Sequence, residues 1–235
     1  MNRVYKALLG VSMIVTLAGF VGCNFLGLEE SDETTPSGAN VFQMVTGQDT
    51  EDDRQHWNTL FNTRAYVFGK EPSVFLRDYV HQLPIGRALD IAMGEGQNAV
   101  YLAKKGFTVD GVDFSEVAIR KARRLARENR VQINTINADL NHYQIRPDSY
   151  DVILNIDYLQ RNLVSQIKRG LKKGGVVLFQ SYTVEQLKNA GGKELRRDYL
   201  LEKGELQELF KDLKIIYFVE TNDGKDAWAK LVAKK

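Results

Sequence analysis

The chain has almost no cysteine, since Cys23 is the only one among 235 residues. A single thiol forms neither a disulfide within the monomer nor a cluster of thiolate ligands. The three histidines stand far apart and none has metal-ligand spacing, so we expect no metal site. No Gly-x-Ser-x-Gly sequence occurs, and a serine hydrolase of the common α/β type therefore has no support.

A strong net charge is also missing. The formal net charge is only +2 at pH 7, although 26% of the residues are charged. Nucleic-acid-binding domains usually carry a marked basic excess. The balance of charges therefore argues against nucleic acid as a partner, and the hydrophobic content of 43% is that of an ordinary globular domain with some extra length.

The first 50 residues differ in composition from the rest. Arg3 and Lys6 precede an uncharged apolar run over residues 7–22, an order typical of an export signal. The run ends in Phe20-Val21-Gly22-Cys23, which resembles the lipobox of bacterial lipoproteins, although leucine is more usual than phenylalanine at its first position. In that family the cysteine becomes the lipidated N-terminus. We therefore expect a signal over 1–23, a flexible tether over 24–50 and a folded domain over 51–235.

Two other interpretations of the N-terminal segment stay open. Residues 7–28 are long enough to span a bilayer as an uncleaved anchor. Alternatively, translation begins at Met44 and the protein is cytoplasmic. Our expectation is a membrane-attached protein that contacts the bilayer through a lipid on Cys23.

Strands and helices alternate along the predicted domain. Helical spacing of apolar residues covers 52–62 and 72–83. The strands that we expect next are 87–93, 108–113, 133–137, 151–156 and 176–182, and the helices are 97–105, 116–129, 163–171 and 205–213. This alternation predicts a doubly wound α/β fold with a mostly parallel sheet. Asn222-Asp223-Gly224 predicts a closing antiparallel hairpin.

The stretch "ALDIAMGEGQNAV", residues 88–100, predicts a strand, a tight glycine turn and a helix. Gly94 and Gly96 fit the dinucleotide pattern, in which a pyrophosphate lies on the turn. Asp90 and Glu95 would repel a pyrophosphate, whereas the sulfonium and ammonium groups of S-adenosylmethionine are attracted to carboxylates. Asp113, at the end of the next strand, can accept hydrogen bonds from ribose hydroxyls. The charge of the turn therefore predicts S-adenosylmethionine as the cofactor.

Each of these acids also has a purely structural interpretation. Asp90 could be a satisfied acid at a strand end, and Asp113 could share a helix N-cap with Ser115. Their combination with the glycine turn favours the cofactor site. Asp139 follows the third strand, where an acid can accept a hydrogen bond from the adenine amino group.

Several longer stretches together resemble class I S-adenosylmethionine-dependent methyltransferases of the tellurite-resistance (TehB-like) type. These are "ALDIAMGEGQNAVYLAKKGFTVDGVDFSEVAIRKA", "NADL", "YDVILNIDYLQRNL" and "LKKGGVVLFQSYT", and with "YVFGKEP" and "DYLLEKGELQELF" the resemblance covers residues 55–235. Ala92-Met93 depart from the Gly-Cys of many members. The resemblance implies a seven-stranded sheet whose last strand is reversed. The predicted cofactor site consists of Asp90, Ala92, Gly94, Glu95, Gly96, Asn98, Asp113, Phe114, Ala138, Asp139, Leu140 and Asn155.

The acceptor of the methyl group is expected at the carboxyl ends of the fourth and fifth strands. Asp157, Arg161 and Tyr182 are the catalytic candidates there, and the resemblance implies that polar residues in these regions line the acceptor pocket. A surface salt bridge for the arginine and simple packing for the tyrosine remain alternatives. Asn155-Ile156-Asp157-Tyr158 lacks the two prolines of the Asn-Pro-Pro-Tyr motif, which argues against a nucleobase methyltransferase.

Two features lie outside this predicted site. Arg120, Arg123, Arg124 and Arg127 share one helical face, which we interpret as solvated, with contact to nucleic-acid or lipid phosphate as the alternative. Aromatic residues between positions 57 and 68 either form a lid over the cofactor or pack the N-terminal helices onto the sheet.

We expect methyl transfer from S-adenosylmethionine to a small-molecule acceptor, such as a chalcogen oxyanion or a thiol. The alternative is an exported lipoprotein that keeps the methyltransferase fold as a non-catalytic binding or scaffold module. The two hypotheses compete because the methyl donor is made in the cytosol, whereas the N-terminal segment predicts export.

Overall fold

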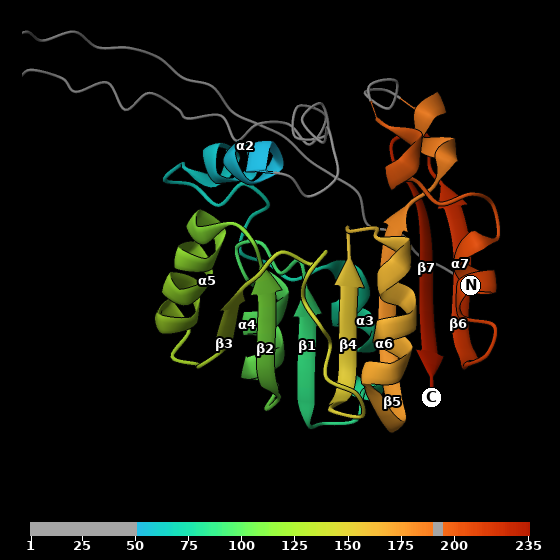
Figure 1. Cartoon of the computed structure of the whole chain (residues 1–235), viewed down its shortest axis with the longest axis horizontal. Coiled ribbons are helices and arrows are strands. Elements are labelled where there is room, and N and C mark those ends of the chain that lie inside the picture. The colour runs from blue at the N-terminus through green and yellow to red at the C-terminus, as the bar shows by residue number, and fades with distance from the viewer. Residues whose placement is uncertain (1–50, 190–194) are drawn as a thin grey trace, which may run out of the picture. The chain divides into compact units, whose positions relative to one another are not determined.

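Seven strands form one mixed sheet, with β4 and β1 at its centre (Figure 1). The strands are β1 (Arg87–Ile91), β2 (Thr108–Asp113), β3 (Asn134–Asn137), β4 (Tyr150–Ile156), β5 (Leu171–Tyr182), β6 (Lys214–Asn222) and β7 (Ala227–Lys234). Their order is β3-β2-β1-β4-β5-β7-β6; β1 to β5 pair in parallel, and β7 is antiparallel to both β5 and β6. The predicted α/β fold, with its reversed last strand and closing hairpin, is confirmed.

The structure is a computed structural model that describes residues 51–189 and 195–235. The expected lipobox at Cys23 and the tether over 24–50 lie outside the described residues, so both stay predictions. Within the part of the chain that is described, no helix has the length and apolar character that a membrane span requires.

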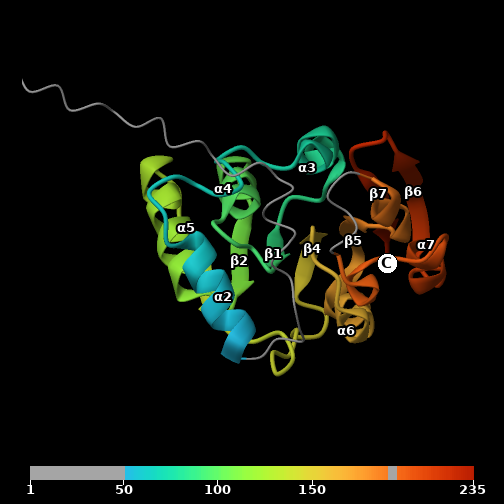
Figure 2. The ribbon, with the colours of Figure 1, turned by 90° about the horizontal axis from the view of Figure 1, so that it is seen from above.

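Helices cover both faces of the sheet, as Figure 2 shows from above. The α-helices are α2 (Glu51–Phe61), α3 (Val74–Tyr79), α4 (Gln97–Lys104), α5 (Glu116–Glu128), α6 (Val164–Gly170) and α7 (Glu205–Leu209). Short 3-10 helices are η1 (Val80–Gln82), η2 (Arg161–Leu163), η3 (Val184–Lys188) and η5 (Arg197–Tyr199). Helices α3 and α4 lie on one face and α6 and α7 on the other, while α2 lies above the edge at which β1 and β2 end.

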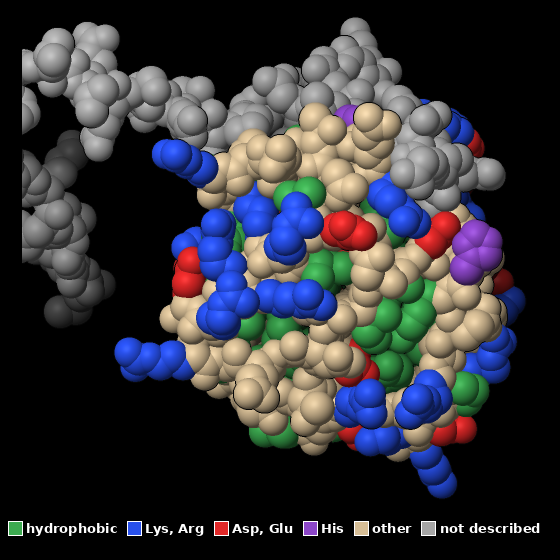
Figure 3. All heavy atoms as spheres, turned by 60° about the vertical axis from the view of Figure 1, so that its left-hand side comes forward, with side chains coloured by type: hydrophobic (Ala, Val, Ile, Leu, Met, Phe, Trp, Pro, Cys, Tyr) green, Lys and Arg blue, Asp and Glu red, His purple; other side chains and the backbone are tan. Residues whose placement is uncertain are grey.

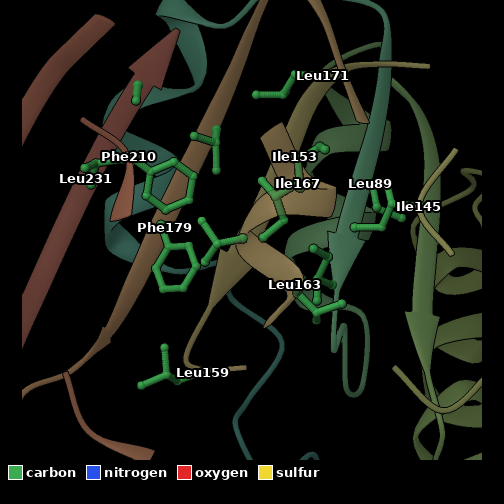
Figure 4. Close-up of a cluster of buried hydrophobic side chains, with 14 of the residues drawn as sticks. Leu89, Ile145, Ile153, Leu159, Leu163, Ile167, Leu171, Phe179, Phe210 and Leu231 are labelled. Carbon is green, nitrogen blue, oxygen red and sulfur yellow. The ribbon is translucent and has the colours of Figure 1, made fainter. Parts of the chain in front are cut away.

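Alternation along the strands divides the apolar residues between two cores. Leu89 and Ile91 of β1 enter the core on the α6 side, whereas Ala88 enters the core beneath α3 and α4. Phe179 and Phe210 pack together in the first of these cores, with ring centroids 5.6 Å apart (Figure 4). Burial on both faces explains why these strands are almost continuously hydrophobic.

One predicted turn has a different place in the fold. Residues 172–175 lie inside β5, where the partner of β4 changes from Leu171 to Val176 and the intervening residues leave the ladder as a bulge. Gly174 has a φ of +83°, and its N–H donates to the carbonyl of Lys235 at 2.8 Å. A pair of glycines serves a bulge as well as a turn, so the sequence could not distinguish the two.

Gly96 offers a direct test of how the glycine turn packs. It is the N-cap of α4 with a φ of +85°, and a Cβ on it would lie 2.6 Å from the Cβ of Ala122 in α5. We expect Gly96→Ala to lower the free energy of unfolding by about 3 kcal/mol, because left-handed strain adds to the overlap. Urea unfolding followed by circular dichroism measures this change.

Gly204→Ala is the matched control. Gly204 is the N-cap of α7 with a φ of +74°, and a Cβ there would meet nothing within 4 Å. It should show the backbone strain alone, about 1 kcal/mol. Equal losses in the two variants would contradict the close approach of the glycine turn to α5.

Candidate cofactor and acceptor site

The predicted cofactor residues gather at the carboxyl edge of the sheet, where β1 pairs with both β2 and β4. In this register Ile91 pairs with Asn155, and Asp113 pairs with Asn137. The strand order reverses at this point, and open α/β sheets bind ligands in such positions. No cluster of three metal-ligating His, Cys, Asp or Glu side chains occurs among the described residues.

Asp90 is a buried carboxyl group with an unused oxygen. Its side chain accepts a hydrogen bond from the backbone N–H of Ala99, but its Oδ2 has no hydrogen-bond partner among the described residues. Burial, with a smaller contribution from Asp113, raises the pKa of Asp90 to about 8. The Oε1 of Gln97, in the first turn of α4, is also buried without a partner in the described chain. A buried carboxyl oxygen and a buried amide oxygen without partners, both near the glycine turn, suit a polar ligand.

Asp113 holds the glycine turn against β2. Its Oδ2 accepts from the N–H of Gly94 at 2.8 Å, and its Oδ1 accepts from the N–H of Ser115 at 2.8 Å. Ser115 is itself the N-cap of α5, because its hydroxyl accepts from the N–H of Ala118 at 3.1 Å. The alternative of a cap that Asp113 shares with Ser115 is thus supported in part, because Ser115 caps α5 and Asp113 binds the N–H of Ser115, while the other carboxylate oxygen of Asp113 holds the glycine turn.

The departure at residues 92 and 93 has a structural consequence. Ala92 adopts a φ of +51°, a left-handed conformation that costs an alanine about 1 kcal/mol. The side chain of Met93 packs over Gly111, where an added Cβ would lie 2.1 Å from its sulfur. The chain thus tolerates alanine where a glycine would be relaxed, and a methionine fills the space above β2.

Glu95 does not face the cofactor edge as we expected. Its side chain is fully buried and ion-paired with Lys121 of α5, and its Oε2 accepts from the N–H of Phe68 at 3.3 Å. The charge argument from the turn therefore depends on Asp90 and Asp113 alone. A lysine on the otherwise apolar face of a predicted helix was the signal that could have revealed this buried pair.

Helix α2 covers the donor side of the site. Its Asn58 accepts a hydrogen bond from the Ser115 hydroxyl at 2.8 Å, and the Arg54 guanidinium lies 5.9 Å from the centroid of the Phe114 ring. Phe61 lies beside Gly94, since a Cβ on that glycine would come within 3.8 Å of its ring. The segment over residues 57–68 thus packs onto the sheet edge and also covers the predicted cofactor residues.

The remaining cofactor candidates divide into two groups. Phe114 and Ala138 lie beside the β2 and β3 ends, where the amide of Asn137 donates to the carbonyl of Phe114 at 3.1 Å. Asp139 accepts from the N–H of Asn141 at 2.8 Å, within its own loop. Leu140 is buried in the α6-side core, Asn98 accepts from the N–H of Ser73, and Asn155 donates to the carbonyl of Tyr158.

Asp157 and Tyr182 lie at the adjacent ends of β4 and β5, and Gln180 of β5 binds Asp157. Asp157 has a φ of +63°, its N–H donates to the carbonyl of Gln180 at 2.9 Å, and its Oδ1 accepts from the Gln180 amide at 2.7 Å. Tyr182 stacks on Trp228 with ring centroids 3.6 Å apart. Burial and the nearby Asp226 raise the pKa of Tyr182 above its usual value, so its hydroxyl stays protonated. Gln180 and Trp228 are site residues that sequence reasoning missed.

The guanidinium of Arg161 binds other partners than Asp157 and Tyr182. Its guanidinium pairs with both carboxylate oxygens of Glu205 and donates to the carbonyls of Asp198 and Leu200 at 2.6 and 2.8 Å. These contacts hold η5 and the start of α7 against η2. The structure therefore favours the salt-bridge alternative for Arg161 over a catalytic part.

Comparison with known proteins finds similarity to methyltransferases. Residues 88–175 match a family described as a methyltransferase domain. A tRNA (uracil(54)-C(5))-methyltransferase of Pyrococcus abyssi is 32% identical over 138 residues, which are 55% of this chain and 31% of that protein. The chain thus spans about a third of the length of this curated relative.

Two solved structures share the fold. TehB from Haemophilus influenzae aligns with a TM-score of 0.59 at 20% identity, covering 77% of this chain and 66% of that one. Geranyl diphosphate C-methyltransferase from Streptomyces coelicolor, in complex with S-adenosyl-L-homocysteine, aligns with a TM-score of 0.55 at 18% identity over 68% and 73% of the two chains. These matches confirm the predicted fold.

The raised pKa of Asp90 predicts how stability changes with pH. The unfolded chain ionises this group near pH 4, whereas the folded protein keeps it protonated up to about pH 8. Its contribution to stability is therefore fully present below pH 4 and is lost as the pH rises to 8. We expect Asp90→Asn to be more stable than the wild type at pH 9 and nearly equal to it at pH 4, as measured by urea unfolding.

Asp212→Asn is the control for this experiment. Asp212 is a surface acid whose pKa is lowered by its hydrogen bond with Lys168, so its loss should not produce the gain at high pH. If wild type and Asp90→Asn changed in parallel between pH 4 and 9, Asp90 would not be the protonated buried group that we describe.

A double-mutant cycle tests whether Arg161 stabilises the fold through its ion pair with Glu205. We expect Arg161→Gln and Glu205→Gln each to lower the free energy of unfolding by about 1–2 kcal/mol, with a coupling energy of about 1 kcal/mol. The reason is that the pair makes two parallel charge-assisted hydrogen bonds at a partly buried position. Strictly additive losses would show that Arg161 and Glu205 do not stabilise the fold as a pair.

Proposed function

We propose that this protein is an S-adenosylmethionine-dependent methyltransferase that acts on a small-molecule acceptor. The observation that carries the proposal is the unused, buried Oδ2 of Asp90 at the switch point of the sheet, close to a glycine turn held by Asp113. The matched methyltransferase domain over residues 88–175 supports it independently.

The described residues fit the proposed cofactor. When bound, S-adenosylmethionine supplies an electrophilic methyl group on a positively charged sulfur. Asp90 is positioned to accept hydrogen bonds from an ammonium group and to ionise beside it, because a neighbouring cation lowers a carboxyl pKa. Asp113 offers carboxylate oxygens at the end of β2, where ribose hydroxyls are bound in related folds.

The acceptor edge suggests what the chain contributes to the transfer. Asp157 is held by two hydrogen bonds to Gln180 at the end of β4. In the sheet, β4 lies beside β1, which carries Asp90 of the predicted cofactor site. In this position the carboxylate of Asp157 orients an acceptor and takes the proton that the nucleophile loses. Tyr182, stacked on Trp228, keeps a neutral hydroxyl at the same edge, where it donates to Asp226 at 3.4 Å.

Of the two expected acceptors, a thiol suits this edge better than a chalcogen oxyanion. An anion needs cationic or hydrogen-bond-donating partners, but the guanidinium of Arg161 is already bound to Glu205. Asp157 and Asp226 add negative charge near Tyr182. An RNA acceptor, as the name of the Pyrococcus abyssi relative states for that protein, is the second candidate.

We also propose that the domain is attached to a membrane through a lipid on Cys23. The position of the only cysteine, directly after an apolar run with a basic start, supports this attachment. A start of translation at Met44 would instead give a cytoplasmic enzyme with ready access to its methyl donor.

Calorimetric titration of S-adenosylmethionine into the detergent-solubilised full chain tests the function. We expect micromolar binding that Asp113→Asn weakens by about 10- to 100-fold, because hydrogen bonds to a charged acceptor are lost. Asp212→Asn, which changes a surface acid far along the sequence, should bind as the wild type does.

A folded wild-type chain that binds no S-adenosylmethionine would contradict the proposal. That result would favour the exported protein that keeps the fold without catalysis. Binding with no transfer to any thiol would leave the cofactor site in place and remove the acceptor class.

A further inference from the structure

The outer face of α5 carries an arginine stripe, which we define as Arg120, Arg123, Arg124 and Arg127 together with Arg130 just beyond the helix. All five residues are exposed. Figure 3 shows Lys and Arg side chains gathered on this side of the molecule. Positions three, four and seven apart share one side of a helix, so the guanidinium groups form a continuous basic surface.

Most of this positive charge is not neutralised within the described chain. The side chains of Arg120, Arg127 and Arg130 form no hydrogen bond or ion pair with any described residue. Arg123 and Arg124 donate to neutral hydroxyls, those of Thr135 at 2.7 Å and Tyr66 at 3.2 Å. A stripe that bound only water would more often alternate with acids at the same spacing.

The acids of α5 stand only at its two ends. Glu116 opens the helix, and Glu128 closes it. Glu128 lies 3.7 Å from Arg124, but it is shared with Lys70, whose ammonium group is 2.8 Å away. The cations therefore outnumber the carboxylates along the whole face.

We propose that the arginine stripe is the surface on which the domain lies against an anionic membrane. The inference depends on the proposed attachment through Cys23, and it adds the orientation that the domain takes there. Each basic side chain near an anionic bilayer surface strengthens binding, so several together act as a second attachment signal beside the lipid.

The place where the described chain begins supports this partner. The described chain begins with α2, which packs against α5 through Asn58, whose side chain accepts from Ser115 and Val117. If residues 24–50 form the predicted flexible tether, a random coil of that length would reach roughly 30 Å. Such a tether would keep the start of α2, and with it the adjoining stripe, close to the bilayer.

An exposed aromatic residue lies near the stripe. Phe68 is 44% exposed and stands two residues before Lys70, which contacts the end of α5. Aromatic rings next to basic groups are common at membrane interfaces. Single-stranded nucleic acid usually needs several stacking rings along a basic groove, and among the described residues Phe68 is the only aromatic side chain of the exposed large hydrophobics. The surface therefore favours lipid headgroups over RNA.

Chemical footprinting of the full chain on vesicles tests the proposal. Arginine reactivity toward phenylglyoxal is measured by mass spectrometry on vesicles of phosphatidylcholine alone and on vesicles that also contain phosphatidylglycerol. We expect Arg120, Arg127 and Arg130 to lose about tenfold in reactivity only on the anionic vesicles, and to regain it at about 1 M salt. Arg77 and Arg169, exposed elsewhere, are the internal controls.

Charge-reversed variants give the second measurement. Arg120→Glu with Arg127→Glu should reduce binding to phosphatidylglycerol vesicles, relative to phosphatidylcholine, by about 30-fold or more. Arg77→Glu with Arg169→Glu carries the same change of charge on other surfaces. This variant should change the ratio of binding to phosphatidylglycerol over binding to phosphatidylcholine less than fivefold. Circular dichroism and S-adenosylmethionine titration confirm that both variants remain folded.

Equal reactivity of the stripe on the two kinds of vesicle would overturn the inference. So would protection by a single-stranded RNA oligonucleotide and not by phosphatidylglycerol, which would assign the surface to nucleic acid. Because footprinting does not depend on methyl transfer, its failure is distinguishable from failure of the proposed function.

Discussion

The buried ion pair between Lys121 and Glu95 is the contact on which the site depends. The side chains are 7% and 0% exposed, and the same ammonium group also donates to the carbonyls of Phe61 and Ala65. One charge thus joins α5, the glycine turn and the segment after α2. Removing either partner of such a pair leaves an uncompensated buried charge, which typically costs about 3–5 kcal/mol. The same ion pair therefore fixes the position of the glycine turn and of the segment after α2 that packs over it.

The strands themselves and the two acids at the strand ends could be predicted from the sequence because their signals are local. Apolar runs, glycine turns and the hairpin at Asn222–Gly224 fix the strands, and parallel strands place their carboxyl ends at one edge. Asp90 is the second-last residue of β1, and Asp113 is the last residue of β2. Their location at that edge follows from the topology alone, whatever their side chains contact.

The direction of a side chain is set by partners that are distant in the sequence, and this is where sequence reasoning failed. Glu95 turns to Lys121, 26 residues later, and Arg161 turns to Glu205, 44 residues later. Helical spacing indicates that Lys121 is buried, but it does not identify the acid that pairs with it, because each pair forms only after separate elements have packed. Asp157 and Tyr182 were correctly placed at neighbouring strand ends, but the bond between Asp157 and Gln180 required the observed register.

The protonated state of Asp90 gives the donor side of the site a further property. A carboxyl group with a pKa of about 8 carries its proton at neutral pH, and it loses this proton when a cation binds beside it. Occupation of the site is then an exchange, in which a positive ligand enters and a hydrogen ion leaves. Ligand affinity would rise with pH across the neutral range, and an acidic compartment would oppose loading of the site without any change in the fold.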